Sequence, residues 1–117
     1  MSKKIGWIAM GLMLAGLSAP AAVSACEITD ATLGCGYDAG CHRNAYTLTW
    51  NTENGCEDPT ARIERKCGNG PWTTLDTSAT SPWVECAPTQ FCATGFVYRI
   101  TSNLGGDSVI VGPTTCN

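Results

Sequence analysis

Beyond residue 25, apolar and polar residues alternate with a period of two, and turn residues interrupt the pattern. No helical period of useful length is present. Because successive residues of a strand face opposite sides of a sheet, this pattern predicts short antiparallel strands. The clearest strand is 45–51, in which Tyr46, Leu48 and Trp50 share one face and threonines occupy the other. We expect Trp50 to lie in the core.

Seven strands are predicted in all: 28–33, 45–51, 61–67, 72–75, 83–86, 96–102 and 108–111. On the sixth, Phe96, Tyr98, Ile100 and Ser102 share one face. Residues 34–44 are rich in glycine and predict a loop, and 68–70 predict the tight turn of a hairpin. Seven short strands at this spacing predict an all-β, immunoglobulin-like sandwich.

The first 25 residues have the pattern of a signal peptide. Lys3 and Lys4 precede an uncharged apolar run over 5–17, Pro20 breaks the run, and 23–25 form a small-residue cleavage site. The apolar run is shorter than the roughly 20 residues that span a bilayer. We therefore expect cleavage after Ala25, one domain over 26–117, no transmembrane segment in the mature chain, and a secreted or periplasmic location.

All eight cysteines lie after the predicted cleavage site, in a region of 92 residues. Export places them in an oxidising compartment, where cysteines form disulfides. A zinc site is the alternative, but no Cys-x-x-Cys pair is present and the chain has one histidine. The sequence therefore predicts four disulfides and no metal. The cysteines are Cys26, Cys35, Cys41, Cys56, Cys67, Cys86, Cys92 and Cys116.

Residues 23–26 also resemble a bacterial lipoprotein box, in which Cys26 would carry lipid. Lipidation would leave seven cysteines and one orphan thiol, which is unusual in an exported protein. Full disulfide pairing is therefore the favoured interpretation, and lipid anchoring at Cys26 is the alternative.

Loss of Lys3 and Lys4 leaves five basic and ten acidic residues, so the mature net charge is 5 − 10 = −5. Nucleic acids and anionic membranes require clustered lysine and arginine, so neither is an expected partner. The one basic cluster, Arg62 to Lys66, is interrupted by Glu64 and is typical of a solvated strand face.

The sequence holds no phosphate loop, nucleophile elbow or metal-binding helix. His42 adjoins Cys41 in the glycine-rich segment, where we expect a surface role. We therefore expect no catalytic residues, no cofactor and no enzymatic activity. Trp72 and Trp83 are the candidate ligand contacts, because each lies beside a turn and exposed tryptophans stack on sugars or anchor protein contacts.

Several segments resemble fibronectin type III domains, over roughly residues 45–111. Trp50 falls where that family places a core tryptophan, while Phe96 replaces a tyrosine whose hydroxyl bonds the preceding loop. We expect disulfides near that corner to offset the loss. The resembling segments are 63–65, 70 and 72–75 for the third and fourth strands, and 98–103 and 106–108 for the sixth strand and its turn.

The resemblance implies that Cys26 and Cys56 lie at one end of the sandwich and the other six cysteines at or near the opposite end. It therefore implies a Cys26–Cys56 disulfide, with the other six pairing among themselves. Among those six, Cys86 with Cys92 is the favoured pair.

These observations predict an exported, non-enzymatic module that binds a protein or a surface glycan through its loops or an exposed strand edge. One alternative is a small secreted inhibitor or toxin-like effector, which the cysteine density also fits. Another is a lipid-anchored envelope protein with a structural role.

Overall fold

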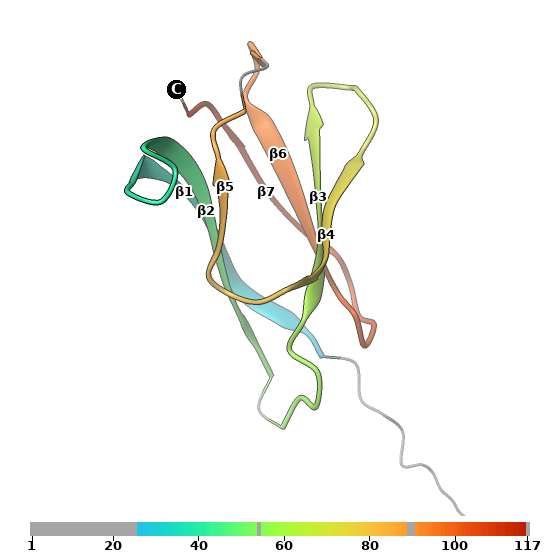
Figure 1. Ribbon diagram of the computed structural model, residues 1–117. Coiled ribbons are helices and arrows are strands. Elements are labelled where there is room, and N and C mark those ends of the chain that lie inside the picture. The colour runs from blue at the N-terminus through green and yellow to red at the C-terminus, as the bar shows by residue number, and fades with distance from the viewer. Residues whose placement is uncertain (1–25, 54, 89–90, 117) are drawn as a thin grey trace, which may run out of the picture.

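Two antiparallel β-sheets pack face to face in the computed structural model, which describes residues 26–53, 55–88 and 91–116 (Figure 1). The predicted signal peptide lies outside the described residues. One sheet has the strand order β1-β2-β5 and the other β4-β3-β6-β7. No helix occurs in the described part of the chain, so none there could cross a membrane. The strands are β1 (Ile28–Asp38), β2 (Arg43–Thr52), β3 (Ala61–Cys67), β4 (Thr73–Ala79), β5 (Trp83–Cys86), β6 (Phe96–Ser102) and β7 (Val109–Thr114).

The core lies between the two sheets and is built by the alternation that the sequence shows. Tyr46, Leu48 and Trp50 of β2 are buried, with Trp50 only 5% exposed. The predicted inward face of β6, from Phe96 to Ser102, is also buried. The predicted core faces of both strands, and the bounds of β3, β5 and β6, are therefore confirmed.

The prediction of a loop over 34–44 is wrong. β1 continues to Asp38 and β2 begins at Arg43, so only 39–42 form the turn. Gly34 and Gly36 pair with Thr47 and Ala45 inside the ladder. Backbone hydrogen bonding to β2 overrides the weak strand propensity of glycine.

Two other strands are longer than expected, again because a neighbour extends them. β4 runs on to Ala79, which pairs with Ala61 of β3. β7 runs on to Thr114, which pairs with Phe96 of β6. Polar sequence alone does not reveal such pairing partners.

All eight cysteines form disulfides, and the predicted Cys26–Cys56 pair is confirmed, with its Cα atoms 5.6 Å apart. The favoured Cys86–Cys92 pair is wrong. Cys86 alternates with the inward-facing Glu85 and so lies on the outer face of its sheet, next to the 39–42 turn, whereas Cys92 is 4% exposed. The remaining pairs are Cys35–Cys116, Cys41–Cys86 and Cys67–Cys92.

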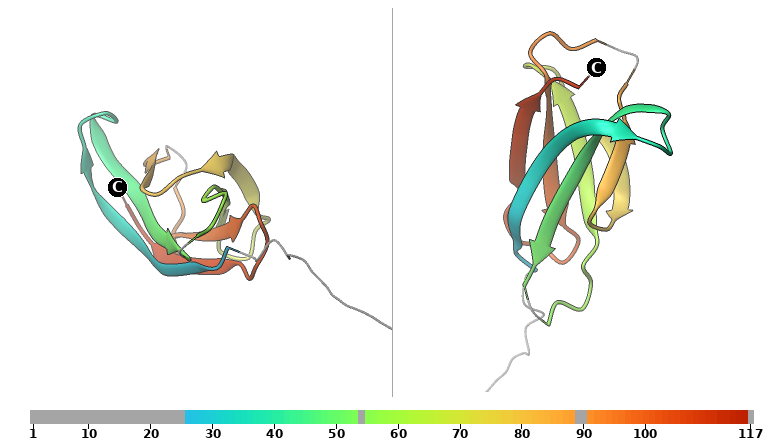
Figure 2. Two further views of the ribbon diagram at one scale, coloured as in Figure 1. Left: turned by 90° about the horizontal axis from the view of Figure 1, so that it is seen from below. Right: turned by 90° about the vertical axis from the view of Figure 1, so that its left-hand side faces the viewer.

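The disulfides divide the sandwich into two distinct ends. The amino-terminal end carries Cys26–Cys56 and the loops 53–60, 80–82 and 103–108. The stapled end carries the other three disulfides, the turn 39–42, the loop 87–95 and the C-terminal residues 115–116 (Figures 1 and 2). The expected separation of the cysteines is confirmed. Because the Cys26 sulfur bonds to Cys56, it is not free to form the thioether of a lipoprotein.

Candidate functional site

Trp83, a candidate ligand contact from the sequence, packs inward. Its ring is partly buried and meets Tyr98, with ring centroids 6.4 Å apart. Its Nε1 donates a hydrogen bond to Asp76 Oδ2 at 3.0 Å, which links β5 to β4 across the two sheets. These contacts give Trp83 a role in closing one side of the sandwich.

Trp72, the second candidate, lies on the outer face of the four-stranded sheet and is partly buried. Two cations cover its ring: Arg99 Cζ lies 4.3 Å and Lys66 Nζ 4.7 Å from the ring centroid. Such contacts contribute roughly 0.5–1 kcal/mol each at exposed sites. Because cations already occupy ring surface, Trp72 is a poor platform for stacking a sugar.

Glu64 organises the charges around Trp72. Its Oε1 accepts a hydrogen bond from Arg99 Nε at 2.8 Å and lies 3.5 Å from Arg62 Nε. The hydrogen bond from Arg99 lowers the pKa of Glu64, against the opposing effect of burial, and the charges of Arg99 and Arg62 lower it further. The same hydrogen bond raises the pKa of Arg99. The expectation that the cluster Arg62 to Lys66 forms one solvated strand face is therefore wrong: Glu64 is buried in ion pairs on the outer face, and Arg65 points inward to Glu85.

The stapled end presents two large aromatic side chains to solvent. Tyr37 is 70% exposed at the end of β1, and Phe91 is 75% exposed in the loop before β6. Each lies next to covalently fixed backbone, since Phe91 immediately precedes Cys92 and Tyr37 follows Cys35 by two residues. Large exposed aromatic residues of this kind are common anchors of protein interfaces.

Tyr37 sits at the tip of the β1–β2 hairpin, which projects beyond the rest of the sandwich (Figure 2). The turn is closed by Asp38, whose carbonyl oxygen and Oδ2 accept hydrogen bonds from the Cys41 amide at 3.1 and 3.0 Å. Cys41 is then bonded to Cys86 of β5, and Cys35 to Cys116. The projecting hairpin is therefore held at two places, at its turn through Cys41 and on β1 through Cys35.

Phe91 is held through its neighbour Cys92, which bonds to Cys67 at the end of β3. The Cys92 carbonyl oxygen accepts a hydrogen bond from the Gly95 amide at 3.1 Å. Gly95 has φ +83°, and a Cβ there would lie 2.9 Å from the backbone of Thr114. Only glycine fits this close approach, which draws the loop against the C-terminal strand.

The described residues offer little material for catalysis. No group of histidine, cysteine, aspartate and glutamate among them could hold a metal ion. Every cysteine is in a disulfide, so none is a free nucleophile. His42, the sole histidine, is exposed in the 39–42 turn, as expected from its sequence context.

The sequence did not single out Tyr37 and Phe91. Tyr37 falls in the predicted 34–44 loop together with its glycine neighbours, and Phe91 lies between the predicted strands 83–86 and 96–102. The available signal was that each aromatic residue stands within two positions of a cysteine. An apolar side chain beside a disulfide is normally buried, so only the structure reveals the exposure.

The chain matches no protein-family model, and no curated protein or solved structure is significantly similar to it.

Proposed function

We propose that this chain is an exported, non-enzymatic binding module that recognises a protein partner through its stapled end. The observation that carries the proposal is the pair Tyr37 and Phe91, two aromatic side chains that are at least 70% exposed at one end of the sandwich. Leaving such rings in water forgoes about 1.5–3 kcal/mol of burial each. A partner that covers them recovers this free energy.

The disulfides support the proposal because they fix the backbone that carries the aromatic anchors. Ordering a loop on binding costs free energy, and a loop that is rigid beforehand avoids most of that cost. Cys41–Cys86 holds the hairpin turn, and Cys67–Cys92 holds the residue next to Phe91. The stapled end thus has the preorganised aromatic anchors that favour a protein ligand.

The fold and the sulfur chemistry support the rest of the proposal. A three-stranded and a four-stranded antiparallel sheet suit a fibronectin type III-like sandwich, a scaffold that presents loops at its two ends. Four disulfides fit a protein that matures in an oxidising compartment, as the predicted signal peptide implies. These features support binding outside the cytosol as part of the proposal.

The test is a quantitative affinity purification from the envelope and culture fluid of the producing cells. The bait is the disulfide-bonded protein, compared with the double variant Tyr37→Ser/Phe91→Ser. Loss of both anchors is expected to lower recovery of the partner about tenfold or more, because truncating an interface anchor costs about 2 kcal/mol or more. Equal recovery by bait and variant would contradict the proposal.

A matched control removes the same kind of side chain elsewhere. Val84 is 42% and Ile110 58% exposed, on the outer faces of β5 and β7. The variant Val84→Ser/Ile110→Ser should retain the partner. If this control variant loses the same proteins as the Tyr37→Ser/Phe91→Ser variant, their recovery reflects non-specific hydrophobic adsorption, and the proposed surface is wrong.

A further inference from the structure

β2 is longer than its neighbour β5, so part of its edge has no strand beside it. The two strands pair only from Ala45↔Cys86 to Leu48↔Trp83, whereas β2 continues to Thr52. An unpaired strand edge presents main-chain donors and acceptors that can pair with another chain.

Two hydrogen bonds show which peptide groups point toward this edge. The Asn44 carbonyl oxygen accepts a hydrogen bond from the Ala87 amide at 3.0 Å, and the Trp50 amide donates to Ser81 Oγ at 2.9 Å. Alternate residues of a strand direct their peptide groups to the same edge. The amide and carbonyl of Thr52 therefore also point toward this edge, beyond Trp83, the first residue of β5.

Pro82 ends the ladder between the two strands. In the β2–β5 register Pro82 falls opposite Thr49 and Ser81 opposite Trp50. Proline has no amide hydrogen to donate. Ser81 contributes its side-chain oxygen in place of a backbone group, within the segment 80–82 that connects β4 of the other sheet to β5.

A cleft of about 570 Å³ opens at this edge. Its volume falls within the range of ligand sites in proteins, roughly 300–1,000 Å³. Trp50 contributes to the lining, although its ring is almost entirely buried. The rest of the lining is mostly amide and hydroxyl groups, which suits a polar backbone better than an apolar ligand. The lining residues are Trp50, Asn51, Thr52, Pro59, Thr80 and Ser81.

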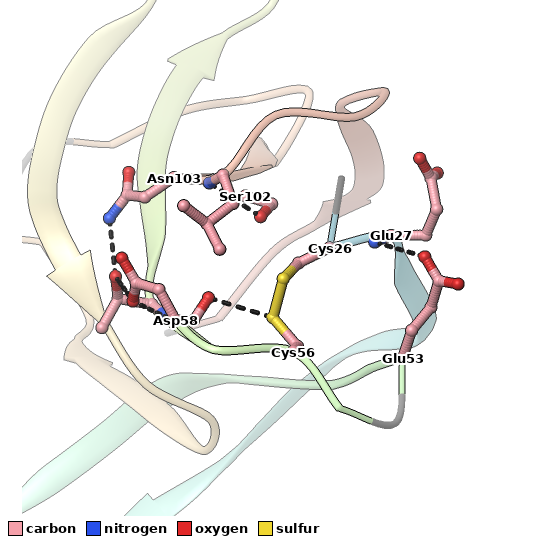
Figure 3. Close-up of a disulfide and its surroundings, with 9 residues drawn as sticks. Cys26, Glu27, Glu53, Cys56, Asp58, Ser102 and Asn103 are labelled. Carbon is pink, nitrogen blue, oxygen red and sulfur yellow. Dashed lines mark hydrogen bonds between the residues drawn. A yellow bond between two sulfur atoms is a disulfide. The ribbon is translucent and has the colours of Figure 1, made fainter. Parts of the chain in front are cut away.

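The two walls of the cleft are tied together before any ligand arrives. On one side, the Thr60 amide donates a hydrogen bond to Asp58 Oδ1 at 3.0 Å, which fixes the turn around Pro59. Asn103 Nδ2 donates to Thr60 Oγ1 at 2.8 Å and to the Thr77 carbonyl oxygen at 2.9 Å, joining that turn to β4 (Figure 3).

The Cys26–Cys56 disulfide anchors the same loop from the other side, as Figure 3 shows. The Glu27 amide donates a hydrogen bond to Glu53 Oε1 at 3.0 Å. This bond joins the residue before β1 to the residue after β2. A preformed cleft of this kind binds without a large ordering cost.

The surroundings of the cleft are acidic. Glu53, Glu57 and Asp58 lie in the loop that follows β2, and the three loops of the amino-terminal end contain no lysine or arginine. Hydrogen bonds from the Thr60 side chain and then from its amide lower the pKa of Asp58, so this carboxylate stays charged near neutral pH. The field at this end favours a cationic ligand.

We propose that this cleft binds an extended, basic polypeptide segment, which adds to the free edge of β2 as a short antiparallel strand. The backbone of the segment pairs with Thr52, next to the Ser81 hydroxyl that already accepts a hydrogen bond from the Trp50 amide. Its basic side chains lie near Glu57 and Asp58, which precede Pro59 of the lining. The site is at the opposite end of the sandwich from Tyr37 and Phe91, so it is independent of the proposed protein-binding surface.

The experiment titrates the isotope-labelled, disulfide-bonded protein, purified after export, with the capped peptide KTVTVK and follows its amide signals by NMR. Signals of 49–52 and 80–81 should shift, and the Thr52 amide should gain protection from hydrogen exchange. A second peptide of the same sequence carries a methyl group on alternate backbone nitrogens. It keeps the charges but lacks the donors for strand pairing, and it should not bind.

Two variants locate the site. Thr52→Pro removes an amide that faces the cleft and not β1, and Thr80→Tyr fills the cleft with an aromatic ring. Each should weaken peptide binding about tenfold or more, whereas Thr115→Tyr, an equal change at the exposed stapled end, should leave binding unchanged. Because Thr80→Tyr changes only a side chain, it keeps the test decisive if Thr52→Pro fails to fold.

Several results would overturn the proposal. They are the absence of shifts at millimolar peptide, equal binding of the N-methylated peptide, and unchanged binding by Thr80→Tyr. Shifts of 49–52 and 80–81 with a neutral oligosaccharide but not with the peptide would assign the cleft to a sugar and would equally overturn it.

Discussion

The hydroxyl of Tyr98 on β6 donates a hydrogen bond to Glu85 on β5, across the space between the two sheets. The second carboxylate oxygen of Glu85 accepts a hydrogen bond from Arg65 of β3. Arg65 in turn lies over the ring of Phe96, with its Cζ 4.6 Å from the ring centroid. A partly buried polar network therefore joins the two sheets at β5, the shortest strand, where the Trp83–Asp76 hydrogen bond also lies.

This network predicts a loss of stability in alkali. Burial, and then the hydrogen bond to Glu85, raise the pKa of Tyr98 above its ordinary value of about 10. Above about pH 10 the unfolded chain releases a proton that the folded protein retains, so the free energy of unfolding falls as the pH rises. Tyr98→Phe should lower that free energy by about 2 kcal/mol near neutral pH and flatten its decline above about pH 10. Urea unfolding across this range checks both, and parallel declines in the two proteins would refute the role of Tyr98.

The Glu64–Arg99 pair predicts a pH dependence on the acid side. The folded-state pKa of Glu64 is lowered, so its contribution to stability is present above the ordinary pKa of about 4.3 and is lost as the pH falls through the folded-state pKa. Arg99→Gln should raise the pKa of Glu64, as measured by carboxyl NMR. Arg43→Gln, which removes a cation that bonds the Ala87 carbonyl oxygen, should not. An unchanged pKa of Glu64 in Arg99→Gln would contradict this assignment.

The disulfides predict a graded loss of stability. Cys35–Cys116 closes 81 residues and Cys67–Cys92 closes 25. The chain-entropy model gives about 4.5 kcal/mol for the first and about 3.5 kcal/mol for the second. Since small domains are stable by about 5–15 kcal/mol, loss of either should be conspicuous in chemical denaturation of paired Cys→Ser variants. A loss below about 1 kcal/mol for Cys35→Ser/Cys116→Ser would show that the C-terminal strand does not depend on its disulfide.

A glycine of β7 predicts a local steric limit. Gly112 has φ +103°, and a Cβ there would lie 2.8 Å from the carbonyl oxygen of Phe96. Gly112→Ala should therefore destabilise the fold by about 1–3 kcal/mol. Gly36→Ala is the matched control, because nothing lies within 4 Å of its added Cβ, and it should change stability by less than about 0.5 kcal/mol. Thermal unfolding of the two variants compares them, and equal melting temperatures would contradict the packing described for β7.

The alternation of apolar residues was sufficient to predict the core. Tyr46, Leu48 and Trp50 stand at every second position, and alternate residues of a strand face the same side of a sheet. Apolar residues with this period therefore mark the buried side. The same rule failed for 34–38, where glycines carry no side chain to show the alternation. Their strand is created by hydrogen bonds to β2, which a local pattern does not contain.

Pairing of the stapled-end cysteines depended on which face of a strand each sulfur occupies. Cys86 and Cys92 are close in sequence, yet Cys86 lies on the outer face of β5 and Cys92 is buried beside β3. The exposure of Tyr37 and Phe91 was hidden for a related reason. Whether a ring beside a disulfide is covered depends on where the neighbouring strands end. Because β1 is longer than the sequence predicts, it carries Tyr37 to the tip of the hairpin, where the ring is exposed.

The disulfide pairing fixes both ends of the sandwich and the backbone beside the aromatic side chains at one of them. Proteolysis of the native protein without reduction, followed by mass spectrometry of the linked peptides, tests it directly. The structure predicts four linked pairs: Cys26–Cys56, Cys35–Cys116, Cys41–Cys86 and Cys67–Cys92. A peptide linking Cys86 to Cys92, or a free thiol at any of the eight positions, would contradict it.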